Sequence, residues 1–75
     1  MKEYNDIELN ELISAGKEAT FKLSNLKFKN QTHEIKKLLI LRRNRLTSIR
    51  KRATELNLTE IDLSNIRDYV QMKTL

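Results

Sequence analysis

Basic residues recur at a helical spacing through the middle of the chain, over residues 31–53. They form two rows whose members are seven residues apart: Lys36, Arg43 and Arg50 in one row, Arg45 and Arg52 in the other. Seven residues are about two turns of an α-helix, so the members of each row lie on one side of it. Arginine suits the phosphate groups of a nucleic acid, because its planar guanidinium donates two parallel hydrogen bonds to one phosphate. The spacing therefore predicts a helix that binds nucleic acid along one face.

The distribution of charge also favours a polyanionic partner. The net charge of the chain is +5, but residues 17–52 hold twelve Lys and Arg against two Glu, an excess of ten positive charges. Such an excess repels itself unless anions neutralise it, which indicates nucleic acid first and an anionic membrane surface second. We expect the contacts with nucleic acid at ten positions in this segment: Lys29, His33, Lys36, Lys37, Arg42, Arg43, Arg45, Arg50, Lys51 and Arg52.

The apolar residues predict the helices that carry these cations. A first series is spaced alternately by three and four residues, as in an amphipathic helix: Leu9, Leu12, Gly16, Ala19, Leu23 and Leu26. We expect this helix to run from about Asp6 to Phe28, with Asn5 or Asp6 as its N-cap. A second series lies within the basic segment, where no Gly or Pro interrupts a helix: Ile35, Leu39, Leu46, Ile49 and Ala53.

The polar residues from Lys29 to Thr32 separate the two predicted helices, and Thr32 suits the N-cap of the second. Two such helices joined by a short loop form an antiparallel hairpin. In the tail we expect a loop over Asn57–Leu63 and a short helix over Ser64–Met72. The predicted fold is therefore all-α: an antiparallel two-helix hairpin over residues 1–56, which binds nucleic acid, and a C-terminal extension over residues 57–75 with a short helix.

The sequence gives little support to other kinds of chemistry. The chain has no Cys and a single His, His33, so neither a disulfide nor a thiolate metal site is expected. We find neither a Ser/His/Asp arrangement nor a glycine-rich phosphate loop. The longest apolar run, Leu38–Leu41, is far too short to span a membrane. We therefore expect no catalytic residue, no cofactor, no metal, no small-molecule substrate and no membrane span.

Three motifs carry a resemblance to a known family, and together they cover roughly residues 5–56. The first helix ends with Lys17, Phe21 and Leu23 in a K-x-x-x-F-x-L pattern. The second helix begins with an H-x-I pattern formed by His33 and Ile35. It continues into a basic block, Leu41-Arg42-Arg43-Asn44 followed by RLTSI. In these motifs the chain resembles the bacterial-type large-subunit ribosomal protein number twenty-nine, a small helical hairpin.

The resemblance implies a structural role in the ribosome. Proteins of this family bind large-subunit ribosomal RNA at the outer surface near the peptide tunnel exit, beside neighbouring ribosomal proteins. It therefore implies that the basic helix face binds ribosomal RNA, and that the chain belongs to the cytoplasmic ribosome of a bacterium or to a plastid or mitochondrial ribosome. The tail after Leu56 would be an extension of the family pattern.

Two other functions remain open from the sequence. A dimeric helical regulator or antitoxin would use the basic helix to bind duplex DNA, although no helix-turn-helix turn is recognisable. A small enzyme of the helical chorismate-mutase kind would need several Arg and Lys around a dicarboxylate. Arg45, Asp62 and Arg67 loosely resemble such a set, but the acidic N-terminal segment contributes no Arg to it.

Overall fold

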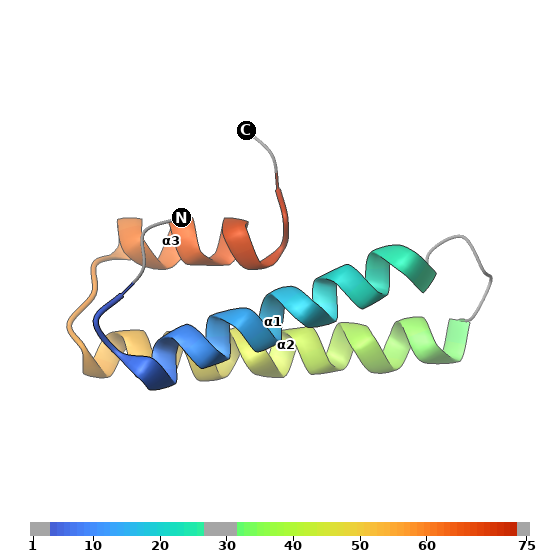
Figure 1. Ribbon diagram of the computed structural model, residues 1–75, viewed down its shortest axis with the longest axis horizontal. Helices are drawn as coiled ribbons and strands as arrows, with labels where there is room; N and C mark the ends of the chain where they lie inside the picture. The colour runs from blue at the N-terminus through green and yellow to red at the C-terminus, as the bar shows by residue number, and fades with distance from the viewer. Residues whose placement is uncertain (1–3, 27–31, 74–75) are drawn as a thin grey trace.

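The structure, a computed structural model, describes residues 4–26 and 32–73 and contains three helices in this part of the chain: α1 (Ile7–Leu26), α2 (Thr32–Glu55) and α3 (Glu60–Val70). The two long helices pack side by side as a hairpin, and α3 folds back along the end of the hairpin where α1 begins and α2 ends (Figure 1). The predicted all-α fold, a hairpin with a shorter C-terminal helix, is confirmed.

Helix α1 begins where the sequence predicts a cap. The Asp6 carboxylate accepts a hydrogen bond of 2.8 Å from the backbone N–H of Leu9, which satisfies one of the free donors of the first turn. The side chains that α1 buries follow its predicted apolar series and add two neighbours to it: Leu9, Ile13, Gly16, Ala19 and Thr20. Ile13, which the predicted series omits, is more deeply buried than the half-buried Leu12.

Helix α2 packs through most of the predicted side chains: of the five, Ile35, Leu46, Ile49 and Ala53 are buried or half-buried. The buried and half-buried positions of α2 and of the residue just beyond it form one stripe: Ile35, Leu38, Arg42, Arg45, Leu46, Ile49, Arg52, Ala53 and Leu56. Leu39, predicted to lie in this series, is 42% exposed, whereas Leu38 is half-buried. Leu39 still lines a shallow groove with Thr20 and Leu23 of α1. The half-buried stems of Arg42, Arg45 and Arg52 widen the buried stripe beyond the predicted apolar residues.

The segment predicted to join the two long helices, Lys29–Thr32, lies outside the described residues except for Thr32, with which α2 begins. At its other end, α2 stops as predicted near Glu55. The backbone of Asn57 has φ of 61°, and the N–H of Leu58 donates a 3.0 Å hydrogen bond to the carbonyl of Ala53. These are the features of a helix end in which one residue adopts the left-handed conformation, and asparagine tolerates that conformation better than most residues.

Helix α3 begins earlier than the sequence analysis predicted. It starts at Glu60, inside the predicted loop Asn57–Leu63, and it ends at Val70. Thr59 is its N-cap: the Thr59 hydroxyl accepts the N–H of Asp62 at 3.2 Å, and the Asp62 carboxylate accepts the N–H of Thr59 at 3.2 Å. This reciprocal pair stabilises a first turn at Thr59, so the expected start at Ser64 was wrong.

The core lies where the three helices meet. It is formed by six buried side chains, two from each helix: Leu9, Ile13, Ile49, Ala53, Ile66 and Val70. Gly16 allows the closest approach, because a Cβ atom there would lie 3.0 Å from Cγ1 of Val70. The helix that comes close to this glycine is α3. A cation–π contact adds to the docking of α3, since Nζ of Lys17 lies 3.8 Å from the ring centre of Tyr69.

Candidate nucleic-acid interface

The ten cationic positions predicted to bind nucleic acid differ in how far the structure exposes them to solvent. Six lie exposed on α2: His33, Lys36, Lys37, Arg43, Arg50 and Lys51. Three are half-buried along the stripe that packs on α1: Arg42, Arg45 and Arg52. Lys29 lies outside the described residues. At about 100° per residue, the row of Lys36, Arg43 and Arg50 points away from the stripe, so these exposed side chains are accessible to a partner.

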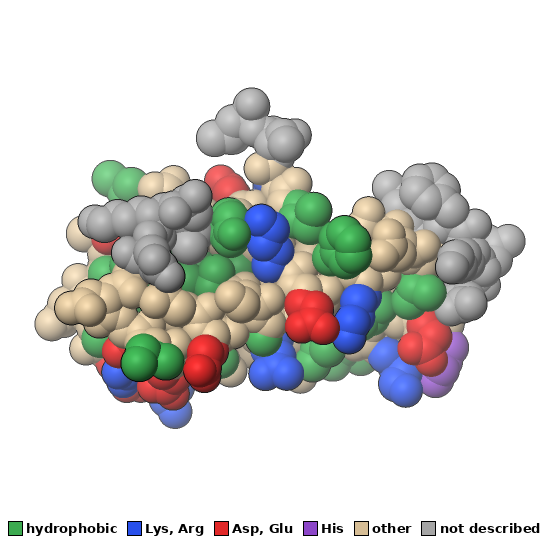
Figure 2. Space-filling model, viewed as in Figure 1, with side chains coloured by type: hydrophobic (Ala, Val, Ile, Leu, Met, Phe, Trp, Pro, Cys, Tyr) green, Lys and Arg blue, Asp and Glu red, His purple; other side chains and the backbone are tan. Residues whose placement is uncertain are grey.

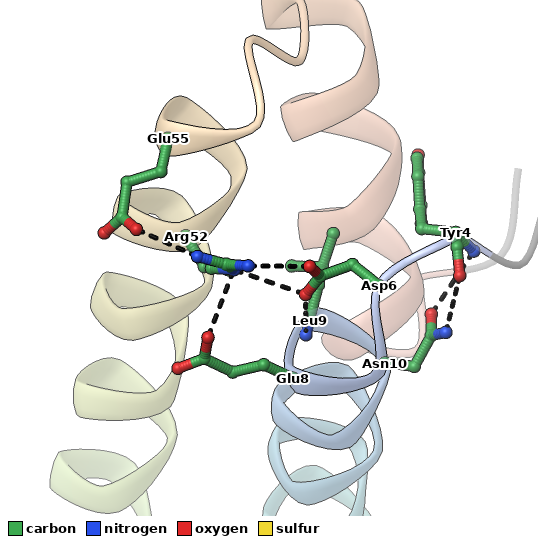
Figure 3. A network of polar contacts seen from close by, with 7 residues as sticks. All are labelled: Tyr4, Asp6, Glu8, Leu9, Asn10, Arg52 and Glu55. Atoms are coloured by element: carbon green, nitrogen blue, oxygen red, sulfur yellow. Dashed lines mark hydrogen bonds and ion pairs between the residues drawn. The ribbon is translucent and has the colours of Figure 1, made fainter.

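Arg52 is enclosed by carboxylates from both long helices and from the chain just before α1 (Figure 3). Its Nη2 lies 2.7 Å from Oδ2 of Asp6, and its Nε lies 3.1 Å from Oε2 of Glu8. Nη1 donates a 3.0 Å hydrogen bond to Glu55. With three carboxylates around it, this guanidinium joins the start of α1 to the end of α2, and we do not assign it to RNA.

The chain before α1 is held at the same end of the molecule. The side-chain amide of Asn10 donates a 2.6 Å hydrogen bond to the carbonyl of Tyr4, and its oxygen accepts the N–H of Tyr4 at 3.3 Å (Figure 3). The pKa of Tyr4 is raised by partial burial and by the nearby Asp62 carboxylate. The residues before α1 are therefore tied to α1, and Tyr4 also packs against the core.

The contacts of Asp6 shift its acidity. Hydrogen bonds from Arg52 and from the backbone N–H of Leu9 lower the pKa of Asp6, and hydrogen bonds to Asp6 and Glu55 raise the pKa of Arg52. A carboxyl whose pKa is lower in the folded than in the unfolded state stabilises the fold above its unfolded pKa, about 3.9. This stabilisation is lost as the pH falls through the folded pKa.

We therefore expect the melting temperature of the protein to change little from about pH 7 to about pH 5 and to fall below about pH 4. Asp6→Asn should melt lower than wild type at neutral pH and lose less stability on acidification, because Asn keeps the N-cap but not the charge. Circular dichroism melts at low salt measure this. Glu11→Gln, which removes an exposed carboxylate of α1, should retain the wild-type acid response. A wild-type response in Asp6→Asn would contradict the role of this pair.

Arg45 faces α1 at the level of Gly16. Its Cβ lies 3.6 Å from where a Cβ of Gly16 would be, and its Nε is buried without a hydrogen-bond partner among the described residues. Arg42 lines a shallow groove farther along the hairpin, with Thr20, Leu23 and Ile35. The row predicted from Arg45 and Arg52 therefore faces the interior of the hairpin, and the seven-residue spacing there reflects packing between helices.

A hollow of about 260 Å³ lies between α2 and α3 beside the exposed row. Arg43 and Arg50 of α2 line it, and α3 contributes Arg67. Arg67 is not among the residues predicted for this interface, because nothing in the sequence indicates that α3 folds back beside Arg43 and Arg50. The available signal was the capping pair Thr59 and Asp62, which marks the start of α3 and so shows that Arg67 lies within a helix.

The face of the molecule drawn in Figure 2 has a different character. Near the start of α1, acidic and basic side chains lie close together, and along the rest of this face they alternate without forming one basic area. Apolar side chains are exposed between them. A surface of this mixed kind is typical of solvent-exposed protein and offers no continuous track for a polyanion.

Within residues 4–26 and 32–73, no group of three or more His, Cys, Asp or Glu side chains is placed to hold a metal ion. None of the helices in the same part of the chain combines the length and the apolar character of a membrane span. Comparison with protein-family models, with curated proteins and with solved structures finds no match to this chain.

Proposed function

We propose that this chain binds structured RNA through the exposed cations of α2, and that the RNA is large-subunit ribosomal RNA. The observation that carries the proposal is a set of five exposed Lys and Arg side chains on the side of one long helix that faces away from α1: Lys36, Lys37, Arg43, Arg50 and Lys51. A helix of 24 residues is about 36 Å long, which presents these charges along a rigid track.

The chemistry of this face suits RNA. Proteins recognise RNA helices mainly through their shape and through phosphate and ribose contacts, and flexible cations on a rigid support provide such contacts. The acids of α2 are two, Glu34 and Glu55, and Glu55 is engaged by Arg52. Few carboxylates on α2 therefore compete for the exposed cations or repel a phosphate backbone.

The ribosomal assignment is supported by the sequence motifs and by the hairpin. The motifs that resemble ribosomal protein number twenty-nine lie on both long helices, and a two-helix hairpin is the fold that this resemblance implies. Within the motifs, His33 and Arg43 are exposed and accessible to RNA. Helix α3 follows the stretch that the resemblance covers, so we treat it as an addition to the family pattern.

The double variant Arg43→Gln/Arg50→Gln tests the RNA interface. We expect it to bind large-subunit ribosomal RNA about a hundredfold or more weakly, since hydrogen bonds to charged groups contribute about 1.5–3 kcal/mol each. Losing two phosphate contacts should also reduce the slope of log affinity against log salt by roughly 1.4–1.8. Filter binding over a range of salt concentrations measures both quantities, and circular dichroism should show unchanged helix content.

The matched control is Lys22→Gln/Lys73→Gln, which removes the same charge from two exposed side chains outside α2. It should retain most of the affinity and of the salt slope. If the arginine variant binds like this control, the exposed face of α2 is not the RNA contact. Tighter binding of a duplex DNA than of ribosomal RNA at equal salt would instead favour the DNA-binding regulator.

A further inference from the structure

Three arginines from two helices surround the hollow between α2 and α3. Arg43 and Arg50 come from one wall, and Arg67 comes from the other. Two of them, Arg43 and Arg67, form no ion pair with any described residue. Arg50 lies 3.7 Å from Glu60, but both side chains are mostly exposed, so this pair is weak. The cations around the hollow thus outnumber the single carboxylate that lines it.

The rest of the lining suits an anion with an apolar or sugar-like body. Leu46, Ile49 and Leu63 form apolar walls, and Ile49 is buried. The half-buried Ser64 makes no side-chain hydrogen bond with the described part of the chain, so its hydroxyl is free to donate one. The Thr47 hydroxyl also lines the hollow, although it already donates to the carbonyl of Arg43 at 3.1 Å.

We propose that this hollow holds a phosphate and its ribose from the bound RNA, clamped between Arg43 and Arg50 of α2 and Arg67 of α3. The proposal rests on RNA binding by α2 and extends it: α3 becomes part of the interface. A phosphodiester matches the lining because arginine forks bind phosphate oxygens in pairs. Apolar side chains beneath them cover the sugar.

The volume of the hollow suits an occupant smaller than a drug-sized molecule, such as one phosphate with its ribose. About 260 Å³ is below the roughly 300–1,000 Å³ that is usual for pockets enclosing drug-sized molecules. The hollow also opens on the side of α2 that carries the exposed row, since Arg43 and Arg50 belong to both. A backbone that follows this row passes the hollow without a change of direction.

Arg67→Gln is the direct test, and Lys73→Gln is its matched control, because both variants remove one exposed positive charge from the C-terminal part of the chain. We expect Arg67→Gln to weaken binding of large-subunit ribosomal RNA about tenfold. It should also lower the slope of log affinity against log salt by about 0.7–0.9. Lys73→Gln should change the affinity and the salt slope much less. Arg67→Lys keeps the charge but not the fork, so it should fall between wild type and Arg67→Gln.

Two further measurements separate a shared phosphate from general attraction. Arg50→Gln and Arg67→Gln combined should weaken binding less than the product of the single effects, because groups that contact one phosphate are coupled. Glu60→Gln should tighten binding more than Glu11→Gln, since each removes one exposed carboxylate but only Glu60 lines the hollow. In NMR titrations with inorganic phosphate, the Nε–H signals of Arg43, Arg50 and Arg67 should shift together.

The outcomes distinguish this inference from the function on which it rests. If Arg43→Gln/Arg50→Gln loses affinity while Arg67→Gln behaves like Lys73→Gln, RNA binding by α2 stands and the clamp is overturned. The clamp would also be overturned if the double variant loses affinity for RNA by the product of the two single losses, because the two arginines would then act independently. If the wild-type chain shows no salt-dependent binding of ribosomal RNA, the proposed function and the clamp fail together, even where inorganic phosphate shifts the arginine signals.

Discussion

Ile49→Asp should unfold the protein. The side chain of Ile49 is 2% exposed and lies in the core where the three helices meet. A carboxylate there would be buried without a partner, which costs several kcal/mol in addition to the roughly 2–5 kcal/mol lost when a large aliphatic side chain leaves a core. At roughly 0.05–0.15 kcal/mol per residue, the free energy of unfolding of 75 residues is about 4–11 kcal/mol. The substitution therefore removes most or all of it.

Ile40→Asp is the matched control for this prediction. It makes the same chemical change on the same helix, but Ile40 is 60% exposed. We expect far-ultraviolet circular dichroism to show a largely unfolded chain for Ile49→Asp and wild-type helix content with a cooperative melt for Ile40→Asp. A cooperative melt of Ile49→Asp near the wild-type temperature would contradict the assignment of Ile49 to the core.

Gly16→Leu should displace α3 from the hairpin. Even a bare Cβ at residue 16 would lie 3.0 Å from Val70, so a leucine side chain does not fit while α3 is docked. Undocking exposes Ile66 and Val70, which are almost completely buried, at a cost of about 1.5–3 kcal/mol for each. The gain in helix propensity on replacing glycine is about 1 kcal/mol, which is too small to compensate.

Hydrogen exchange measures the effect on each helix separately. In Gly16→Leu we expect the amides of α3 to lose protection while those of α1 and α2 retain part of theirs. Ser14→Leu adds the same side chain at an exposed position of α1 and should leave α3 protected. Protection of α3 in Gly16→Leu equal to that in wild type would show that α3 does not depend on the close contact at Gly16.

Much of the local structure could be predicted from the sequence, because local spacing and capping determine it. The alternation of apolar residues by three and four predicted α1 within one residue of its observed start, and Asp6 acts as its cap. The predicted end at Phe28 lies outside the described residues. The absence of Gly and Pro predicted the continuous α2. The start of α3 also has a local signal in the sequence, since Thr59 and Asp62 form a capping box, but Ser64 is a competing cap residue five positions after Thr59.

The division of the arginines could not be predicted in the same way. Arg45 and Arg52 repeat every seven residues just as Arg43 and Arg50 do, and this period says only that each pair shares a side of the helix. Which side packs depends on where α1 lies. The partner that engages Arg52 most closely, Asp6, is 46 residues away in the chain. No local pattern contains that information, because the contact exists only once the hairpin has closed.

The sequence by itself thus determined the helices, the excess of positive charge on α2 and the small residues at the centre of α1. The tertiary structure decided that Arg52 joins the two ends of the hairpin, that Arg45 lies against α1 beside Gly16, and that Arg67 meets the exposed row of α2. The physical reason is the range of the interactions. Helix propensity and capping act within a few residues, whereas the docking of α3 depends on Ile66 and Val70 finding the space beside Gly16.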